Sequence, residues 1–269
     1  MVSGVRGAWL PVRVNICWPL KPALPPEDQT IVSRPFSCLA IETATELPGL
    51  ALLRGDRLAL REARGLRAPS RAVFEWVREL LLETETSLGQ LDCVAFGAGP
   101  GSFTGVRVAV ALAQGLGFAR GLPLCPVSSL ATLAAGAFRN STADTVACCL
   151  DARMGEVYLG IYRRDATAGV VALVADALLA PEAVRLPGPG SILAVGNGWT
   201  AYPELLTHLE ARLVDVLPEQ LPSAADLAYL ARPRYLAGQI VSPLDALPNY
   251  LRDRVASVPA SMLTGRSVQ

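Results

Sequence analysis

Apolar residues in the first half of the chain form short continuous runs that alternate with stretches of helical spacing. The run at 38–41 predicts a buried strand, and the runs at 49–53 and 58–63, on either side of a polar turn, predict a hairpin. From 70 to 83 the apolar residues recur at helical spacing behind Ser70, which is a good N-cap. The next segments are predicted to be a strand at 93–96, a helix at 104–120, a strand at 122–127 and a helix from Ser128 or Ser129 to about 138.

The second half of the chain repeats this order in outline. The predicted elements are strands at 146–150, 156–162, 170–174 and 192–195, a helix around 202–209, a strand at 213–217 and a helix after Ser223 that Pro233 should kink or end. The repetition predicts two related α/β lobes. We assign 37–140 to the first lobe and 141–269 to the second lobe and a C-terminal tail.

Residues 1–36 differ from the rest of the chain. They contain six prolines and show no clear hydrophobic period. Prolines at this density disfavour both helices and sheet ladders. We therefore expect a disordered N-terminal extension or a mis-assigned start, with the true start at a valine such as Val32.

Composition narrows the chemistry that the chain can perform. Its 269 residues carry 24 basic and 24 acidic side chains, and this zero net charge argues against holding nucleic acid by bulk electrostatics. His208 is the single histidine, which excludes a metal site with two imidazole ligands. Lys21 is the single lysine, so the folded body has no phosphate-loop or Schiff-base lysine. No run of about 20 uncharged apolar residues predicts a membrane span.

The six cysteines show no C-x-x-C spacing. Five of them lie in or beside apolar, strand-like runs. This placement favours reduced, buried thiols in a cytoplasmic protein over disulfides or metal ligands. The cysteines are Cys17, Cys38, Cys93, Cys125, Cys148 and Cys149.

A glycine-rich segment at 97–107 is the strongest candidate for a ligand site. It follows a predicted strand and begins a predicted helix, so its backbone N–H groups suit an anion. The alternative is a tight turn that needs glycine at positive φ, although four glycines in nine residues exceed what a turn needs. The candidate ligand residues are Gly99, Gly101, Ser102, Thr104 and Gly105.

The helix that follows this segment predicts a partner interface. It carries no charge from 108 to 119, and small residues recur in it at intervals of four. A helix that is apolar all round must be buried on every side, either by its own domain or by a partner. The helix at 70–83 also has a broad apolar face. The predicted interface comprises Phe74, Val77, Leu81, Val106, Ala109, Val110, Ala113, Leu116 and Gly117. If that face is external, Ala113→Arg should disrupt the complex and spare the fold.

Charged residues near the predicted strand ends suggest weaker candidates. Glu42 and Thr43 follow the first strand and could orient water or Mg²⁺ near a phosphate. Asp151, Arg153 and Glu156 occupy the corresponding place in the second half, where a charged hairpin turn is the alternative. Six arginines between 54 and 71 could contact RNA phosphates, although we favour a solvated surface as their explanation.

Three segments together resemble the bacterial TsaB (YeaZ) family. They are Ile-Glu-Thr-Ala-Thr at 41–45, Gly-Pro-Gly-Ser-Phe-Thr-Gly-Val-Arg at 99–107 and Asp-Ala-Arg-Met-Gly-Glu-Val-Tyr at 151–158. The resemblance implies the actin/sugar-kinase/Hsp70-like fold. It also implies a non-catalytic subunit that works with the catalytic protein TsaD and the ATPase TsaE to place threonylcarbamoyl on the adenosine beside the anticodon of tRNAs that read codons beginning with A.

The resemblance further implies how the chain assembles and what it lacks. The heterodimer contact with TsaD would use the two first-lobe helices, and tRNA would be met only through the complex. The phosphate turn of the fold commonly reads D-x-G-x-T, whereas this chain has Glu42, Ala44 and Glu46 at the three defining positions. We therefore expect no catalytic residue, no metal and no tightly bound cofactor.

Three alternatives remain open at this point. The chain could be an active sugar- or acetate-kinase-like enzyme, which would need an aspartate base and an intact adenosine site. It could be a peptidase, as older family names suggest, although a nucleophile–histidine pair is missing. It could also form a purely structural dimer.

Overall fold

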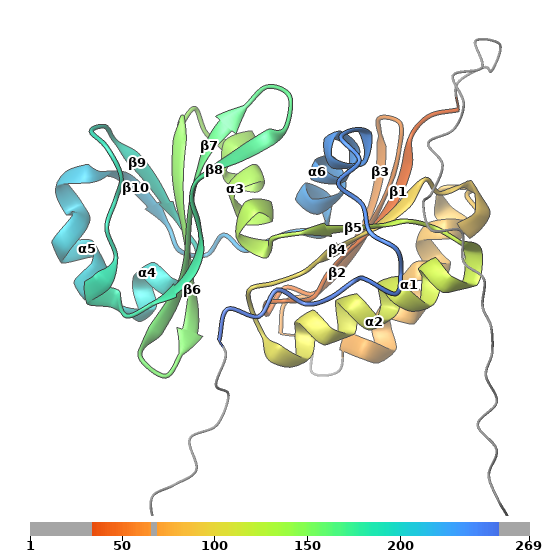
Figure 1. The fold of residues 1–269 in the computed structure, drawn as a ribbon, viewed down its shortest axis with the longest axis horizontal. Helices are drawn as coiled ribbons and strands as arrows, with labels where there is room; N and C mark the ends of the chain where they lie inside the picture. Colours follow the sequence, from red (N-terminus) through yellow and green to blue (C-terminus); the bar gives the residue numbers. More distant parts are fainter. Residues whose placement is uncertain (1–33, 66–68, 253–269) are drawn as a thin grey trace, which may run out of the picture. The chain divides into compact units, whose positions relative to one another are not determined.

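The computed structural model describes residues 34–65 and 69–252 (Figure 1). Most of the predicted N-terminal extension, 1–36, therefore lies outside the described residues. Its last residues belong to the folded body, because the Gly55 N–H donates to Phe36 O at 2.8 Å and the Phe36 ring lies 5.5 Å from that of Tyr235.

The first half of the chain forms a five-stranded sheet in the order β3-β2-β1-β4-β5. Its strands are β1 (Ser37–Glu42), β2 (Gly49–Arg54), β3 (Arg57–Glu62), β4 (Cys93–Gly97) and β5 (Leu124–Val127). The hairpin strands β2 and β3 are antiparallel to their neighbours, whereas β4 and β5 run parallel to β1. Every residue of β1 is buried, which explains why apolar residues follow one another in this strand instead of alternating with polar ones.

Three helices complete the first half: α1 (Pro69–Glu83), α2 (Phe103–Arg120) and α3 (Ser129–Asn140), with a short 3₁₀ helix at Leu88–Gln90. Ser102 caps α2 and Ser128 caps α3, because each hydroxyl accepts from backbone N–H groups of the first turn. Gly121 ends α2 in the left-handed conformation, with φ 64°.

The second half forms another five-stranded sheet in the order β10-β9-β6-β7-β8. Its strands are β6 (Thr145–Arg153), β7 (Glu156–Asp165), β8 (Gly169–Leu179), β9 (Ile192–Val195) and β10 (Leu213–Leu217). Read from β8 to β10, the order and strand directions match those of the first sheet. The expectation of two related α/β lobes is confirmed.

Two of the three helices of the second half are shorter than those of the first half. The three helices are α4 (Gly198–Ala201), α5 (Glu204–Leu209) and α6 (Ala224–Leu236), with 3₁₀ turns at Pro181–Ala183 and Glu210–Arg212. The single helix expected around 202–209 is wrong in its start, because Tyr202 and Pro203 separate α4 from α5. Pro233 does not end α6, since it lies in the last turn, where only one helical hydrogen bond is lost.

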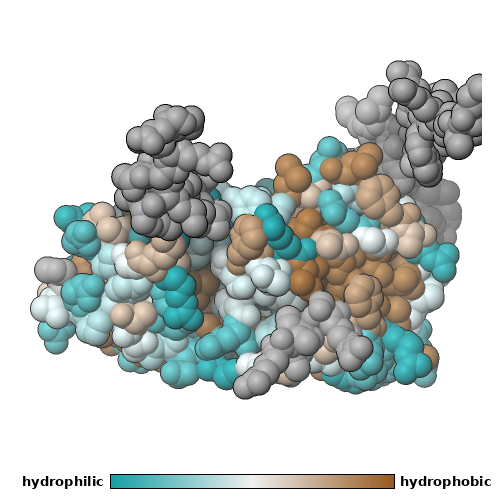
Figure 2. Space-filling model, turned by 90° about the horizontal axis from the view of Figure 1, so that it is seen from below, coloured by the Kyte–Doolittle hydropathy of each residue, from teal (hydrophilic) through white to brown (hydrophobic). Residues whose placement is uncertain are grey.

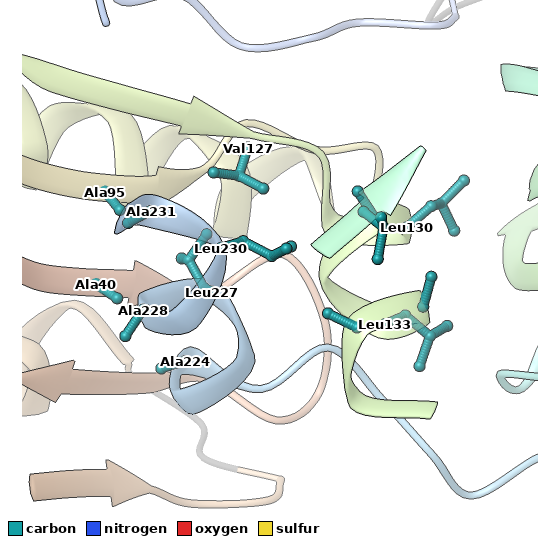
Figure 3. Close-up of a cluster of buried hydrophobic side chains, with 14 of the residues drawn as sticks. Ala40, Ala95, Val127, Leu130, Leu133, Ala224, Leu227, Ala228, Leu230 and Ala231 are labelled. Atoms are coloured by element: carbon teal, nitrogen blue, oxygen red, sulfur yellow. The ribbon is translucent and has the colours of Figure 1, made fainter. Parts of the chain in front are cut away.

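The last helix of each half packs against the sheet of the other half. Helix α3 packs against β6, β7 and β8, whereas α6 packs against β1 and β2. Figure 3 shows α6 over the first sheet, with Ala228 beside Ala40 and Ala231 beside Ala95, while Leu130 projects from α3. The lobe boundary that we assigned at residue 140 therefore separates the two sheets. It does not separate each sheet from the helices that cover it, because α3 and α6 each cover the sheet of the other half.

The described cysteines agree with the expectation of reduced, buried thiols. All five are free and buried: Cys38, Cys93, Cys125, Cys148 and Cys149. Burial raises the pKa of the Cys125 thiol to about 12, which keeps it protonated and unreactive. Cys17 lies outside the described residues.

Candidate functional site

Helix α2 is buried along the small-residue stripe that the sequence suggested as an open interface. Ala109 and Ala113 are fully buried against the first sheet. At Gly117 a Cβ atom would lie 2.8 Å from Pro243 Cγ and 2.9 Å from Leu124 Cδ2, so only glycine fits. The interface assignment is therefore wrong for the buried members of the predicted set, which belong to the core: Val77, Val106, Ala109, Val110, Ala113 and Gly117.

The outward side of α2 carries a different pair of small residues. Ala111 and Gly115 are exposed, and a Cβ atom on Gly115 would meet nothing within 4 Å. They lie in an apolar groove of about 400 Å³ between α1 and α2. Its lining consists of Val73, Phe74, Val108, Ala111, Leu112, Gly115 and Leu116.

The groove belongs to a larger apolar surface. Phe74 is 65% exposed and Leu82 is 69% exposed, both on α1. Leu81 and Leu116 are half-buried at the edge of the core. Figure 2 shows hydrophobic side chains gathered over this part of the molecule. Contiguous exposed apolar surface of this kind marks an interaction site.

Sequence reasoning missed Ala111 and Gly115 although the information was present. They have the same four-residue spacing as Ala109 and Ala113, two positions further along the helix. Because the helix carries no charge from 108 to 119, the sequence does not mark either stripe as the outer one. Contacts with the sheet and with the distant Pro243 decide which stripe is buried.

A second cavity, of about 540 Å³, lies between the two lobes. From the first lobe it is lined by the turn after β1, by the glycine-rich loop and by Phe103. From the second lobe it is lined by the β6–β7 hairpin and Asn197. Residues 249–252 of the tail complete the lining. Of the predicted anion-loop residues, Gly101 and Ser102 line this cleft, whereas Gly99, Thr104 and Gly105 do not.

The glycine-rich loop has packing reasons for its glycines. A Cβ atom on Gly105 would overlap Thr43 O, and one on Gly101 would overlap Ala44 O. The loop thus packs directly on the backbone of the turn after β1, and the Ser102 N–H donates to Ala44 O at 2.6 Å. The number of glycines no longer argues for a ligand, and anion binding at this loop stays a prediction.

Glu42 and Thr43 do not face the cleft, contrary to the expectation that they meet a ligand. Both are buried. Glu42 Oε1 accepts from the Ala44 N–H at 2.8 Å and Oε2 accepts from Ser129 Oγ at 3.0 Å. The Thr43 hydroxyl donates to Gly105 O at 2.6 Å. These side chains join β1 to the starts of α2 and α3, and a role toward a metal or phosphate stays a prediction.

Burial dominates the electrostatics of Glu42. Loss of solvent raises its pKa to about 7, against the smaller lowering effects of the hydrogen bonds from Ala44 and Ser129. Its counterpart at the end of β6 is Asp151, which is half-buried and lines the cleft. Asp151 Oδ1 accepts from the Arg153 N–H at 2.7 Å, as Glu42 does from its own second neighbour.

Comparison with known proteins agrees with this architecture. A family model described as TsaD, tRNA N6-adenosine threonylcarbamoyltransferase, matches residues 66–260. The tRNA threonylcarbamoyladenosine biosynthesis protein TsaB of Escherichia coli K12 is 38% identical over 223 residues, which cover 81% of this chain and 95% of that protein. The chain belongs to the TsaB (YeaZ) family.

Other TsaB relatives support the same assignment. The Haemophilus influenzae protein of that name is 34% identical over 229 residues, covering 82% of this chain and 95% of its own length. The structure described as YeaZ from Pseudomonas aeruginosa has a TM-score of 0.75 and 38% identity, covering 80% of this chain and 100% of that chain. The TsaB fold is therefore the actin-like pair of lobes that the resemblance implied.

The arginine-rich stretch of this TsaB-family chain forms ion pairs at the surface. Arg61 pairs with Glu79 at 2.9 Å and with Glu83 at 2.7 Å. Arg64 pairs with Glu219 at 3.1 Å. These contacts favour the solvated-surface interpretation over contact with RNA phosphates for the arginines that the structure describes.

The described residues, 34–65 and 69–252, can be compared with the requirements for a metal site and for a membrane span. Among them, no group of three or more His, Cys, Asp or Glu side chains could hold a metal ion. Within the same ranges, no helix has the length and apolarity needed to cross a membrane.

Proposed function

We propose that this chain is a non-catalytic subunit of the apparatus that makes threonylcarbamoyladenosine in tRNA, and that it docks on TsaD through α1 and α2. The apolar groove between these helices carries the proposal. Its lining is entirely apolar, and Phe74 stands 65% exposed beside it. A partner of the same fold would lay its own helices into the groove and form a helix bundle.

The small residues of α2 suit such a partner. Ala111 and Gly115 leave space above the helix axis, so the backbone of an incoming helix can approach closely. Phe74 and Leu82 supply larger apolar side chains beside this space. A buried centre with large apolar anchors is typical of stable interfaces.

The interior of the first lobe supports the non-catalytic part of the proposal. Glu42 takes the place of the phosphate-turn aspartate, but its carboxylate is enclosed and accepts two protein hydrogen bonds. We accordingly propose that no cofactor binds tightly. TsaE would join the TsaD complex, and tRNA would be contacted only indirectly, in the cytoplasm.

Pull-down of TsaD tests the docking face. Ala111→Arg and Gly115→Arg should each weaken TsaD binding by about 100-fold, because a charge fills the groove centre. Ala201→Arg is the matched control, since Ala201 is exposed on α4 of the second lobe and does not line the groove. Equal binding by all three variants would contradict the docking assignment.

Reconstitution of tRNA modification tests the subunit role. TsaD and TsaE with the substrate tRNA should form threonylcarbamoyladenosine efficiently only when this chain is added. Titration of the isolated chain with Mg-ATP provides a separate test. Tight binding with turnover would overturn the non-catalytic assignment and favour the kinase-like alternative.

A further inference from the structure

We infer that residues 249–252 form an intramolecular strap, which fixes the start of the docking helix α2 to the β6–β7 hairpin of the second lobe. The tail runs along α2 before it reaches the cleft (Figure 1), with the Gln114 amide donating to Ala246 O at 3.1 Å. The strap then crosses the cleft and is bound at both ends. Its second-lobe end is a guanidinium-binding site that the chain's own Arg252 occupies.

The first-lobe end of the strap is held by a backbone hydrogen bond and an aromatic stack. The Asn249 N–H donates to Ala98 O at 2.6 Å. Arg107 Nε donates to the Tyr250 hydroxyl at 2.7 Å, and its guanidinium carbon lies 3.5 Å from the centroid of the Phe103 ring. The Phe103 and Tyr250 rings are 6.0 Å apart. Tyr250 is therefore held at the start of α2 by the hydrogen bond from Arg107, whose guanidinium carbon also lies 5.7 Å from the centroid of the Tyr250 ring.

The second-lobe end is held by the Arg252 guanidinium. Its Nη2 lies 2.6 Å from Glu156 Oε2 and 3.1 Å from Ala152 O. The Arg252 side chain is only 16% exposed, so these charge-assisted hydrogen bonds are largely shielded from water. Arg153 and Met154 at the hairpin tip have φ of 62° and 59°, which shapes the turn around the guanidinium.

The geometry makes the strap a mechanical link between the lobes. Only Leu251 separates Tyr250, bound to the first lobe, from Arg252, bound to the second. The chain passes between the two sheets after β5 and again after β10. The strap adds a third link, whose two ends are attached to the lobes by non-covalent contacts. Because Arg107 lies one helical turn before Ala111, the strap also couples the hairpin to the docking helix. The proposed TsaD docking is not a premise of this link.

Perturbing one end of the strap and measuring the other end tests the inference. Hydrogen–deuterium exchange of the full chain without partners would be followed in peptides from 103–110 and from 151–158. Arg252→Gln should raise exchange by about tenfold in the hairpin and also in the first turns of α2. Tyr250→Ala should produce the reciprocal effect, with faster exchange in the hairpin.

Arg212→Gln is the matched control, because the Arg212 guanidinium donates to the carbonyl groups of Gly190 and Pro187 within the second lobe. It should leave both peptides unchanged. If Arg252→Gln affects the hairpin alone, Arg252 has a local role and the strap is refuted. Unchanged exchange at the far end in both strap variants refutes it equally, whatever the pull-down with TsaD shows.

Discussion

The two lobes share one strand order, but the groove that we propose as a docking face lies on the first lobe. In the first lobe, α1 and α2 span 15 and 18 residues and expose an apolar groove. In the second lobe, the corresponding places hold the 3₁₀ turn Pro181–Ala183 and the short helices α4 and α5. Trp199 on α4 is fully buried, and its Nε1–H donates to Val195 O at 3.2 Å.

The difference shows that the shared strand order does not determine which surfaces stay apolar and exposed. Both lobes bury their sheets with the same layer arrangement. The first lobe has longer helices at these places, and the residues of α1 and α2 that line the groove are small or apolar. In the second lobe, the large aromatic residue of α4, Trp199, is buried in the core of that lobe. The predictions that follow separate residues that cover a sheet from residues that face outward.

The largest effect is expected for Ala113→Arg. Ala113 is fully buried, so the variant places an unpaired charge in the core at a cost above about 5 kcal/mol, and we expect it not to fold. Ala111→Arg, two residues away and exposed, should change the free energy of unfolding by less than about 0.5 kcal/mol. Urea denaturation measures both. If Ala113→Arg folds, the assignment of Ala113 to the core is wrong and its side of α2 is accessible.

Aromatic truncation distinguishes the two lobes directly. Trp199→Ala should lower the free energy of unfolding by about 4 kcal/mol, because it leaves a cavity in the second lobe. Phe74→Ala removes a ring that is 65% exposed and should cost less than about 0.5 kcal/mol while weakening TsaD binding. Thermal and chemical denaturation measure the two stability changes, and a binding titration measures the affinity for TsaD. A larger loss of stability for Phe74→Ala than for Trp199→Ala would contradict the prediction.

Two glycines of α2 should respond to alanine in opposite directions. Gly105→Ala forces a methyl group onto Thr43 O and should cost about 3 kcal/mol. Gly115→Ala places its methyl group in open space and should stabilise the protein by about 0.5–1 kcal/mol through helix propensity. Denaturation midpoints give both values. Equal destabilisation by the two changes would mean that the outer face of α2 is not free.

A further prediction concerns pH, and its expected effect is smaller than those of Ala113→Arg, Trp199→Ala and Gly105→Ala. Because burial raises the pKa of Glu42 from 4.5 to about 7, the folded state holds the proton more tightly than the unfolded state. The contribution of Glu42 to the free energy of unfolding is therefore fully present below pH 4.5 and is lost as the pH rises to about 7. Glu42→Gln should therefore flatten the decline in the free energy of unfolding over this range and stabilise the protein by about 2 kcal/mol at pH 8.

Asp226 provides the internal reference for this titration. Burial raises its pKa to about 6, so it gives a decline of the same sign in the wild-type chain and in Glu42→Gln. The difference between the two pH profiles isolates Glu42. Parallel profiles would mean that Glu42 titrates near its ordinary value despite being enclosed.

Local patterns were enough to predict most of the architecture. The strands at 192–195 and 213–217 match the structure residue for residue, and the duplicated order revealed two lobes. Apolar runs and caps are local properties, so a single sequence reports them. The division of 202–209 was missed because Pro203 also suits the first turn of a helix.

The candidate sites depended on contacts that no local pattern reveals. The burial of Ala113 rather than Ala111 is decided by the sheet beneath α2. Glu42 faces inward because Ser129 and Gly97, from two distant segments, surround its carboxylate. The strap joins Arg252 to Glu156 across about a hundred residues. Sequence thus indicated which segments matter but not which side of each is accessible.

The exchange of α3 and α6 between the sheets has a consequence for biosynthesis. The strands of the first sheet are complete once β5 has been made, but the helix that covers their inner face is encoded about a hundred residues later. At 5–20 residues per second, a ribosome needs roughly 5–20 seconds to supply it. Throughout that interval the nascent chain presents the alanine-rich side of a finished sheet. Neither half can be synthesised alone as a complete domain, and chaperone demand should peak before residue 236 emerges.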